Sequence, residues 1–252
     1  MKAYWFIVKN SFKSSSQFFI DLVFAVANPI LQVLGLLLFY SFVLNQQTGL
    51  DSSVVLYFLF VMMTSGVELF RFATDIGQDI ESDYYLTIDK LPINPFVYYM
   101  LQNLGKNLAP ITFLGIGVLP ILIFYKVSAA IIILFYIATL LALVISYLIF
   151  FIVGAARFFT SALEPWLFGI IFQFLSGKLI PITFLPSQYF SLFLSFMPFI
   201  YASGAYATYI SEGNLTGLLF GMGIGTLWCG ILFVFATFLW NKGVSRYQEL
   251  GE

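Results

Sequence analysis

Long stretches without any charged side chain constrain the fold of this chain more than any other feature. Between Lys126 and Arg157 the sequence contains no Asp, Glu, Lys or Arg. A helix that crosses a bilayer needs about 20 mainly apolar residues, so this stretch is long enough to span a membrane. Of all residues only 9% are charged and 61% are hydrophobic. A water-soluble domain carries about 25% charged residues, so we expect most of this chain to be surrounded by lipid.

The charged residues divide the chain into six expected membrane-spanning helices. They lie at about residues 22–44, 53–70 and 107–125, within 127–156, from about 163 to 178, and at about 215–240. We therefore expect an all-α integral membrane fold, with residues 1–252 forming a single transmembrane domain.

Residues 181–213 are apolar but contain Pro181, Pro186 and Pro198. We expect them to form an external re-entrant hairpin between the fifth and sixth spans, because irregular backbone is tolerated at membrane depth where protein buries it. A seventh span is the alternative interpretation of this segment.

The distribution of basic residues favours six spans with both termini in the cytosol. In that topology nine of the eleven Lys and Arg residues are cytosolic, and only Lys126 and Lys178 are external. This agrees with the positive-inside rule. A seventh span would instead place Lys242 and Arg246 outside the cell.

Residues 1–20 have the pattern of an amphipathic helix that lies along the cytosolic leaflet. At about 100° per residue, Lys9 and Lys13 fall on one side, and Trp5 and Phe12 belong to an adjacent apolar stripe. This arrangement is typical of helices that lie in the membrane interface. Such a helix is either a simple membrane anchor or a connector joined to a motor subunit.

Residues 71–106 form the only sizeable cytosolic loop that the topology allows. The loop holds five of the twelve acidic residues, which are Asp75, Asp79, Glu81, Asp83 and Asp89. Acidic side chains are repelled by the negatively charged cytosolic leaflet, so residues 75–90 are expected to form a solvated helix. This helix, which includes Tyr84, either is simply solvated or docks in the basic groove of a partner.

Two glutamates near the ends of the expected spans have alternative interpretations. Glu68 and Arg71 are neighbours at helical spacing, which favours an ion pair. Glu164 precedes Pro165 at the start of a helix, where the helix dipole favours an acid. Proton coupling is the functional alternative for both, because acidic residues within membranes are commonly functional.

Small and uncharged polar residues supply the remaining candidates. Gly213, Gly217, Gly221 and Gly225 recur every four residues, which lets another helix of the same chain or of a second subunit approach closely. Three polar residues at lipid depth, and the phenylalanine that follows the last of them, either bond neighbouring helices or line a substrate path. These residues are Asn28, Gln32, Gln173 and Phe174.

The sequence lacks the residues that most enzyme classes require. It contains no histidine and one cysteine, so we expect no metal site of the usual kind and no histidine-based catalysis. No GxxxxGK[ST], HExxH or GxSxG motif is present, so ATP binding in a phosphate loop and the hydrolases with those motifs are disfavoured. The net charge of −1 argues against a nucleic-acid partner. We expect no catalytic residue, metal or cofactor in this chain.

Three segments carry a resemblance to a known family. They are FLSGKLIP at 174–181 with FLP at 184–186 and MPF at 197–199, LWNKGVSRY at 239–247, and the looser match LTIDKLP at 86–92. Together with the order of the expected elements, these segments resemble the permeases of ABC-2 type exporters over essentially the whole chain. The branch that they resemble contains small bacterial permeases long classed as a domain of unknown function.

The resemblance implies a multi-pass permease of the bacterial cell membrane, paired with an identical or homologous second permease. Two copies of a separate ABC ATPase would bind ATP and magnesium and would push on the acidic loop and on the N-terminal helix. The path between the two permeases would then open outward, with the hairpin as an external gate. The apolar composition favours a hydrophobic or amphipathic substrate. The alternative is an ion-coupled secondary transporter or channel that uses Glu68 or Glu164, and such proteins often contain internal repeats.

Overall fold

The computed structural model describes residues 2–16, 19–43, 52–65, 69–160, 165–180 and 196–250. These residues form helices joined by turns, and no strand occurs among them. The four longest helices are α2 (Phe19–Val43), α6 (Pro95–Phe124), α7 (Ala129–Ala155) and α11 (Leu215–Leu250). The shorter elements are α1 (Lys2–Ser16), α3 (Ser52–Ser65), α4 (Leu69–Glu81), α5 (Tyr85–Asp89), η1 (Ala156–Phe158), α8 (Pro165–Leu175), η3 (Pro198–Ala202) and α10 (Gly204–Ser211).

Four helical stretches are long and apolar enough to cross a membrane. They are Leu22–Phe42, Pro95–Phe124, Ala129–Phe158 and Leu215–Arg246. The helices α3 and α8, at the positions of the second and fifth expected spans, are apolar but shorter. The all-helical architecture that the sequence predicts is therefore confirmed, with four long candidate spans among the described residues.

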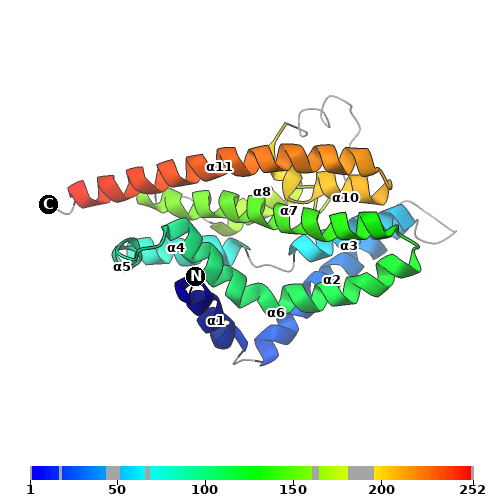
Figure 1. Cartoon of the computed structure of the whole chain (residues 1–252), viewed down its shortest axis with the longest axis horizontal. Coiled ribbons are helices and arrows are strands. Elements are labelled where there is room, and N and C mark those ends of the chain that lie inside the picture. Colours follow the sequence, from blue (N-terminus) through cyan, green and yellow to red (C-terminus); the bar gives the residue numbers. More distant parts are fainter. Residues whose placement is uncertain are drawn as a thin grey trace.

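Helix α7 lies at the centre of an elongated bundle (Figure 1), and α3 and α4 pack along it one after the other. The ring of Phe60 in α3 lies 5.3 Å from that of Phe135, near the start of α7. Further along, the ring of Phe72 in α4 lies 5.4 Å from that of Tyr147. Gly154 permits the close approach of α4, because a Cβ atom there would lie 2.8 Å from the Cβ of Ile76. Helices α3 and α4 thus follow the direction of α7.

Helix α11 packs against α7 and also covers α10. Three of the four regularly spaced glycines face tyrosines of α10: Gly217 and Gly221 adjoin Tyr209, and Gly225 adjoins the hydroxyl of Tyr206. This stripe therefore packs within one chain. The fourth glycine, Gly213, has a φ of +65°, and a Cβ atom there would have no neighbour within 4 Å, so it serves the turn before α11.

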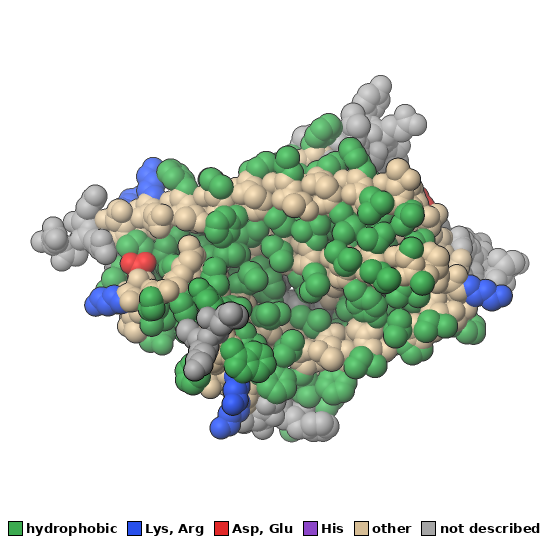
Figure 2. Space-filling view, in the orientation of Figure 1, with side chains coloured by type: hydrophobic (Ala, Val, Ile, Leu, Met, Phe, Trp, Pro, Cys, Tyr) green, Lys and Arg blue, Asp and Glu red, His purple; other side chains and the backbone are tan. Residues whose placement is uncertain are grey.

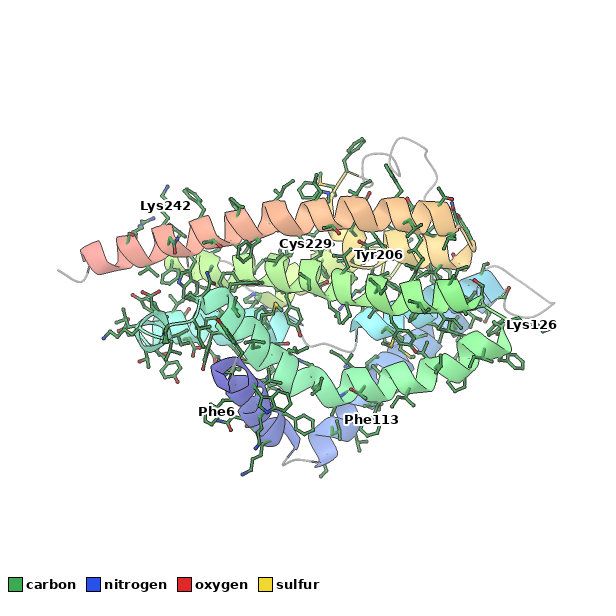
Figure 3. All side chains as sticks on the ribbon, viewed as in Figure 1. Phe6, Phe113, Lys126, Tyr206, Cys229 and Lys242 are labelled. Carbon is green, nitrogen blue, oxygen red and sulfur yellow. The ribbon has the colours of Figure 1, made fainter. Side chains whose placement is uncertain are left out.

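The bundle has two ends, which Figures 1 and 3 show. One end, called the α5 end, holds α5 and the C-terminal part of α11 with Lys242. The other, called the Lys126 end, holds the turn between α6 and α7 and the start of α11. Charged side chains on the face shown in Figure 2 lie near these ends and on α1, with hydrophobic side chains between them. An apolar belt between charged ends is the surface that a bilayer requires.

The sequence predicts that residues 71–106 are a loop with a single solvated helix, but the structure contains several packed helices there. They contain most of α4, all of α5 and the first part of α6. The physical reason is that α4 is amphipathic and buries Phe72, Ile76 and Ile80 against the bundle. Helix α6 begins at Pro95, where the Asn94 side chain caps the helix by accepting a hydrogen bond from the Phe96 amide at 2.9 Å.

Part of the expected re-entrant hairpin, residues 181–195, lies outside the described residues. In the described remainder, residues 200–207 are buried inside the bundle. The ring of Phe199 in η3 lies 6.2 Å from that of Phe172 in α8, and Tyr206 in α10 lies 6.0 Å from Phe60 in α3. From there α10 leads to the turn at Gly213 at the Lys126 end (Figure 1).

Candidate functional site

Three acidic residues of α4 are bound to other helices of the same chain. A carboxylate oxygen of Asp75 lies 2.9 Å from the Lys106 ammonium of α6. Asp79 accepts a hydrogen bond of 3.0 Å from the Tyr99 hydroxyl, also of α6. Arg157 of η1 donates a hydrogen bond of 3.1 Å to Glu81. These contacts fix α4 to α6 and to the end of α7.

Asp83, Tyr84 and Asp89, in contrast, form the exposed part of this corner. The Tyr84 side chain is 51% exposed, and Asp83 has a φ of 60° in the turn between α4 and α5. The five acidic residues of the segment are therefore not equivalent. Among them, Asp83 and Asp89 are exposed carboxylates without a bond to another helix in the described part of the chain, so they are the ones that a partner could reach most readily.

Asp79 occupies a half-buried position beside this corner. Burial raises the pKa of its carboxyl above the usual 3.8, and the neighbouring charge of Asp75 acts in the same direction. The hydrogen bond from Tyr99 and the charge of Lys106 oppose the increase. The carboxylate is thus held in place by hydrogen bonding at a cost in solvation.

The N-terminal helix α1 packs closely against α6. A Cβ atom at Gly105 would lie 2.6 Å from the carbonyl oxygen of Val8 and 2.7 Å from the Cβ of Ser11. Val8 is buried in this contact, whereas Trp5 is 66% exposed and Phe12 is 38% exposed. The apolar stripe of α1 is therefore divided between the contact with α6 and an outward apolar surface. The side chains of Lys9 and Lys13 are also exposed.

One short part of α6 thus connects α1 with α4. Gly105 receives α1, the next residue, Lys106, pairs with Asp75, and Tyr99 binds Asp79 from two turns earlier in the helix. We call residues 99–106 the α6 junction. A displacement of α4 would act on α6 through two polar side-chain contacts, and α6 contacts α1 over backbone atoms at the same place.

The four candidates for a substrate path do not form one cluster of contacts. Asn28 and Phe174 are exposed, on α2 and α8, and Gln32 and Gln173 are half-buried. No side-chain hydrogen bond links any of the four within the described parts of the chain. They lie on α2 and α8, which, like the other long helices, have apolar outward faces; the exposed large side chains on α2 and α8 include Leu31, Leu34, Leu38, Trp166, Ile170 and Phe174.

The topology based on basic residues places Lys178 in an external loop, but the structure does not. Its side chain is only 4% exposed, and its ammonium donates a hydrogen bond of 2.7 Å to the carbonyl oxygen of Thr64 near the end of α3. Gly177, with a φ of 74°, follows α8 and turns the chain so that Lys178 enters the bundle. The FLSGKLIP segment thus contains a buried junction.

Residues 176–179, which we call the 176–179 segment, are bound on several sides by other elements. The Tyr57 hydroxyl of α3 donates to the Gly177 carbonyl at 2.6 Å, and the Tyr40 hydroxyl of α2 donates to the Leu179 carbonyl at 2.9 Å. The Gly204 amide of α10 donates to the Ser176 carbonyl at 2.8 Å. The charge pattern of the sequence does not predict this junction, although a lysine inside an apolar run is a signal for it.

The C-terminal LWNKGVSRY segment continues α11 beyond the expected end at residue 240. Trp240 is buried, and its ring lies 5.3 Å from that of Phe158 and 5.4 Å from that of Phe151. Gly243 makes room for Phe158, since a Cβ atom would lie 2.5 Å from its ring. Arg246 lies over the ring of Phe159 at 5.7 Å. These contacts join the end of α11 to η1.

The other acidic candidates, Glu68 and Glu164, lie outside the described residues. Among the residues that the structure does describe, no three His, Cys, Asp or Glu side chains lie close enough together to hold a metal ion.

A bundle of long apolar helices, with a hydrophobic belt between charged ends, defines a helical membrane protein. The family model described as ABC-2 family transporter protein matches residues 26–251, and the chain therefore belongs to the ABC-2 family of transporters. The expectation of an ABC-2 type permease is confirmed. A comparison with curated proteins gave no match.

Proposed function

We propose that this chain is the membrane-spanning permease subunit of an ATP-driven exporter and contains no ATPase site of its own. The observation that carries the proposal is the α6 junction in a chain of the ABC-2 family. Through this junction, helix α4, which leads to the exposed corner, is bonded by its side chains to the long helix α6. ATP and magnesium would be bound by a separate ATPase, present in two copies.

The corner between α4 and α5 is the proposed docking site for that ATPase. Asp83, Tyr84 and Asp89 would contact a basic groove of the ATPase, because they are the exposed members of the segment. The carboxylates of Asp75, Asp79 and Glu81 are engaged within the chain, so their role is to transmit displacement rather than to bind the partner. This arrangement requires the α5 end and both termini to be in the cytosol.

Transmission would proceed through the α6 junction. Movement of α4 would pull on Lys106 and Tyr99, and α1 would follow because it contacts α6 closely at Gly105. Helix α1 would thereby act as a connector as well as an interfacial helix, with Trp5 and Phe6 in the membrane interface.

A second permease subunit, identical or homologous, would complete the substrate path. Helices α2 and α8 are the proposed walls, because both expose apolar faces that also carry Asn28 and Phe174. Such a path suits a hydrophobic or amphipathic substrate. We expect this assembly in the cell membrane of a bacterium.

The docking proposal can be tested by changing the exposed corner without touching the internal contacts. Asp83→Lys combined with Tyr84→Ala should weaken co-purification of the tagged chain with its ATPase and should uncouple ATP hydrolysis from transport. Glu212→Lys is the matched control, because Glu212 is an exposed acid in the turn between α10 and α11, and α11 starts at the Lys126 end (Figure 1). An ATPase that binds and hydrolyses ATP equally well with both variants would contradict the docking site, and a chain that never associates with an ATPase would contradict the proposed function.

A further inference from the structure

Lys178 is the one buried charged side chain among the described residues. Its ammonium has one hydrogen-bond acceptor, the Thr64 carbonyl oxygen at 2.7 Å, and lies 5.7 Å from the centre of the Phe172 ring. No carboxylate of the described residues lies within ion-pair distance of it. A lysine that is buried without an opposite charge is costly and therefore needs a physical reason.

The position of Lys178 makes that cost larger. Thr64 lies between Phe60, which contacts Phe135 of α7, and Phe72, which contacts Tyr147. Residues 135 and 147 lie on either side of the midpoint of α7, so Lys178 lies between the two charged ends of the bundle. Ionisable groups at this depth in membrane proteins generally mark a substrate or ion pathway.

Capping the end of α3 uses only part of the hydrogen-bonding capacity and charge of the Lys178 ammonium. The last carbonyl groups of a helix accept hydrogen bonds from lysine side chains and carry a partial negative charge of about half a unit. A neutral donor could make the same bond to Thr64. The ammonium has three donors, of which the structure pairs one.

The neighbouring acceptors are committed elsewhere. The carbonyls of Ser176, Gly177 and Leu179 accept hydrogen bonds from Gly204, Tyr57 and Tyr40. The hydroxyl of Thr64 bonds to Ser203 at 3.2 Å. The hydroxyl oxygen of Ser65, next to the acceptor of Lys178, is buried and has no hydrogen-bond partner within the described parts of the chain. Among the described residues, the junction therefore combines a lysine that has no carboxylate partner with an unused hydroxyl group.

We propose that Lys178 binds the anionic headgroup of an amphiphilic substrate, a phosphate or carboxylate on an apolar tail, as the substrate passes between α2 and α8. This inference rests on the proposed function as a permease. The substrate supplies the opposite charge that the described part of the chain lacks at this depth, and separation of the 176–179 segment from α3 presents the ammonium to the path. The apolar faces of α2 and α8 accommodate the tail.

The test uses the permease–ATPase complex in phosphatidylcholine vesicles. Stimulation of ATP hydrolysis is measured with three additions: phosphatidic acid in the vesicle, free decyl phosphate, and decyltrimethylammonium as a cation with the same tail. We expect stimulation by the anionic additions but not by the cation. A response to phosphatidic acid alone indicates a lipid substrate, and a response to decyl phosphate alone indicates a free amphiphile. Equal stimulation by the anionic and cationic additions overturns the proposal.

Variants separate charge recognition from helix capping. Lys178→Gln keeps a donor for Thr64 but removes the charge, so it should melt near the wild-type temperature while the half-saturating concentration of the anion rises about tenfold or more. Lys178→Arg should retain the anion response, and Lys126→Gln, which removes a lysine at the exposed α6–α7 turn, should leave it unchanged. A wild-type anion response in Lys178→Gln shows that Lys178 is only a cap and overturns the proposal.

A binding measurement keeps this inference separate from the proposed function. Decyl phosphate is titrated into the detergent-purified chain alone, wild type and Lys178→Gln, and calorimetry records binding. Weaker binding to Lys178→Gln supports the anion site even where no ATPase assembles with the chain. Equal binding to both proteins, or binding to neither, counts against the site.

Discussion

Three acidic residues of α4 each contact a side chain from another helix. Asp75 has an ammonium beside it, Glu81 a guanidinium, and Asp79 a tyrosine hydroxyl. Burial also raises the pKa of Asp79. At the scale of single residues, burial makes ionisation of Asp79 costly to the fold, and the hydrogen bond from Tyr99 offsets part of that cost.

Asp79→Asn should make the protein more resistant to heat at neutral pH. A raised pKa means that the folded state binds the proton of Asp79 more tightly than the unfolded state, so the wild type loses stability as the pH rises through that raised pKa. Asn carries no charge and still accepts from Tyr99. Thermal unfolding in detergent should give the variant an equal or higher midpoint at about pH 7.5, and the difference should shrink toward about pH 4. A variant that melts below the wild type at the higher pH would contradict this explanation.

Helices of this bundle approach each other closely where glycine replaces a side chain. Gly105 permits the contact between α1 and α6, Gly154 that between α4 and α7, and Gly225 that between α10 and α11. Several other glycines, including Gly117 and Gly223, have open space at the Cβ position. Helices α6 and α11 thus each contain a closely packed glycine and a glycine with open space, which serves as its control.

Gly105→Val should loosen α1 from α6. The new side chain would meet the carbonyl oxygen of Val8, a backbone atom that cannot rotate away, and overpacking of this kind typically costs about 1–3 kcal/mol. Tryptic cleavage at Lys9 and Lys13 should accelerate as α1 detaches. Gly117→Val in the same helix is the control and should cleave at the wild-type rate. Equal cleavage of the two variants would show that α1 does not depend on Gly105.

Gly225→Ala should destabilise the contact between α10 and α11, and Tyr206→Phe should relieve the clash. The added methyl group would overlap the Tyr206 hydroxyl, the atom that the Phe variant removes. We expect a cost of about 1–3 kcal/mol for Gly225→Ala and a smaller cost for the double variant, a non-additive result that thermal unfolding can measure. Gly223→Ala should be neutral or slightly stabilising, since alanine favours helix. Strictly additive effects of the pair would mean that the stripe does not pack on α10.

Charge spacing along the sequence predicts the helices but misplaces several of their ends. The charge of Lys106 suggests a boundary for the third span, yet α6 begins at Pro95, because the Lys106 ammonium pairs sideways with Asp75 and does not interrupt the helix. The same reasoning assigns Lys178 to an external loop, although it is buried beside Thr64. A sequence shows where charges occur, but not which distant carbonyl or carboxylate neutralises them.

The candidate site could be predicted at the level of its segments and not at that of its contacts. The acidic segment at 75–90 and the N-terminal helix, both predicted from the sequence, adjoin the α6 junction. The carboxylates of α4 that are bonded inside the chain are selected by Tyr99, Lys106 and Arg157. These three residues lie well after α4 in the sequence, so the sequence alone does not reveal the contacts. The polar residues chosen for a substrate path lie on α2 and α8 without contacting one another.

At the scale of the whole molecule, the bundle combines a hydrophobic belt with one exposed polar corner bonded to its long helices. We propose that ATP hydrolysis on another subunit displaces the α5 end of the bundle and that α6 and α7 transmit this displacement. An ion-coupled transporter would instead take its energy from a gradient across the same membrane.

The most direct measurement is uptake of a fluorescent amphiphile in liposomes that contain the purified chain with or without its ATPase. The proposed ATP-driven mechanism predicts uptake only when the ATPase and ATP are both present, no uptake with ADP, and no loss of uptake when a protonophore collapses the proton gradient. Uptake by the chain alone under an imposed ion gradient, abolished by the protonophore and indifferent to ATP, would contradict it.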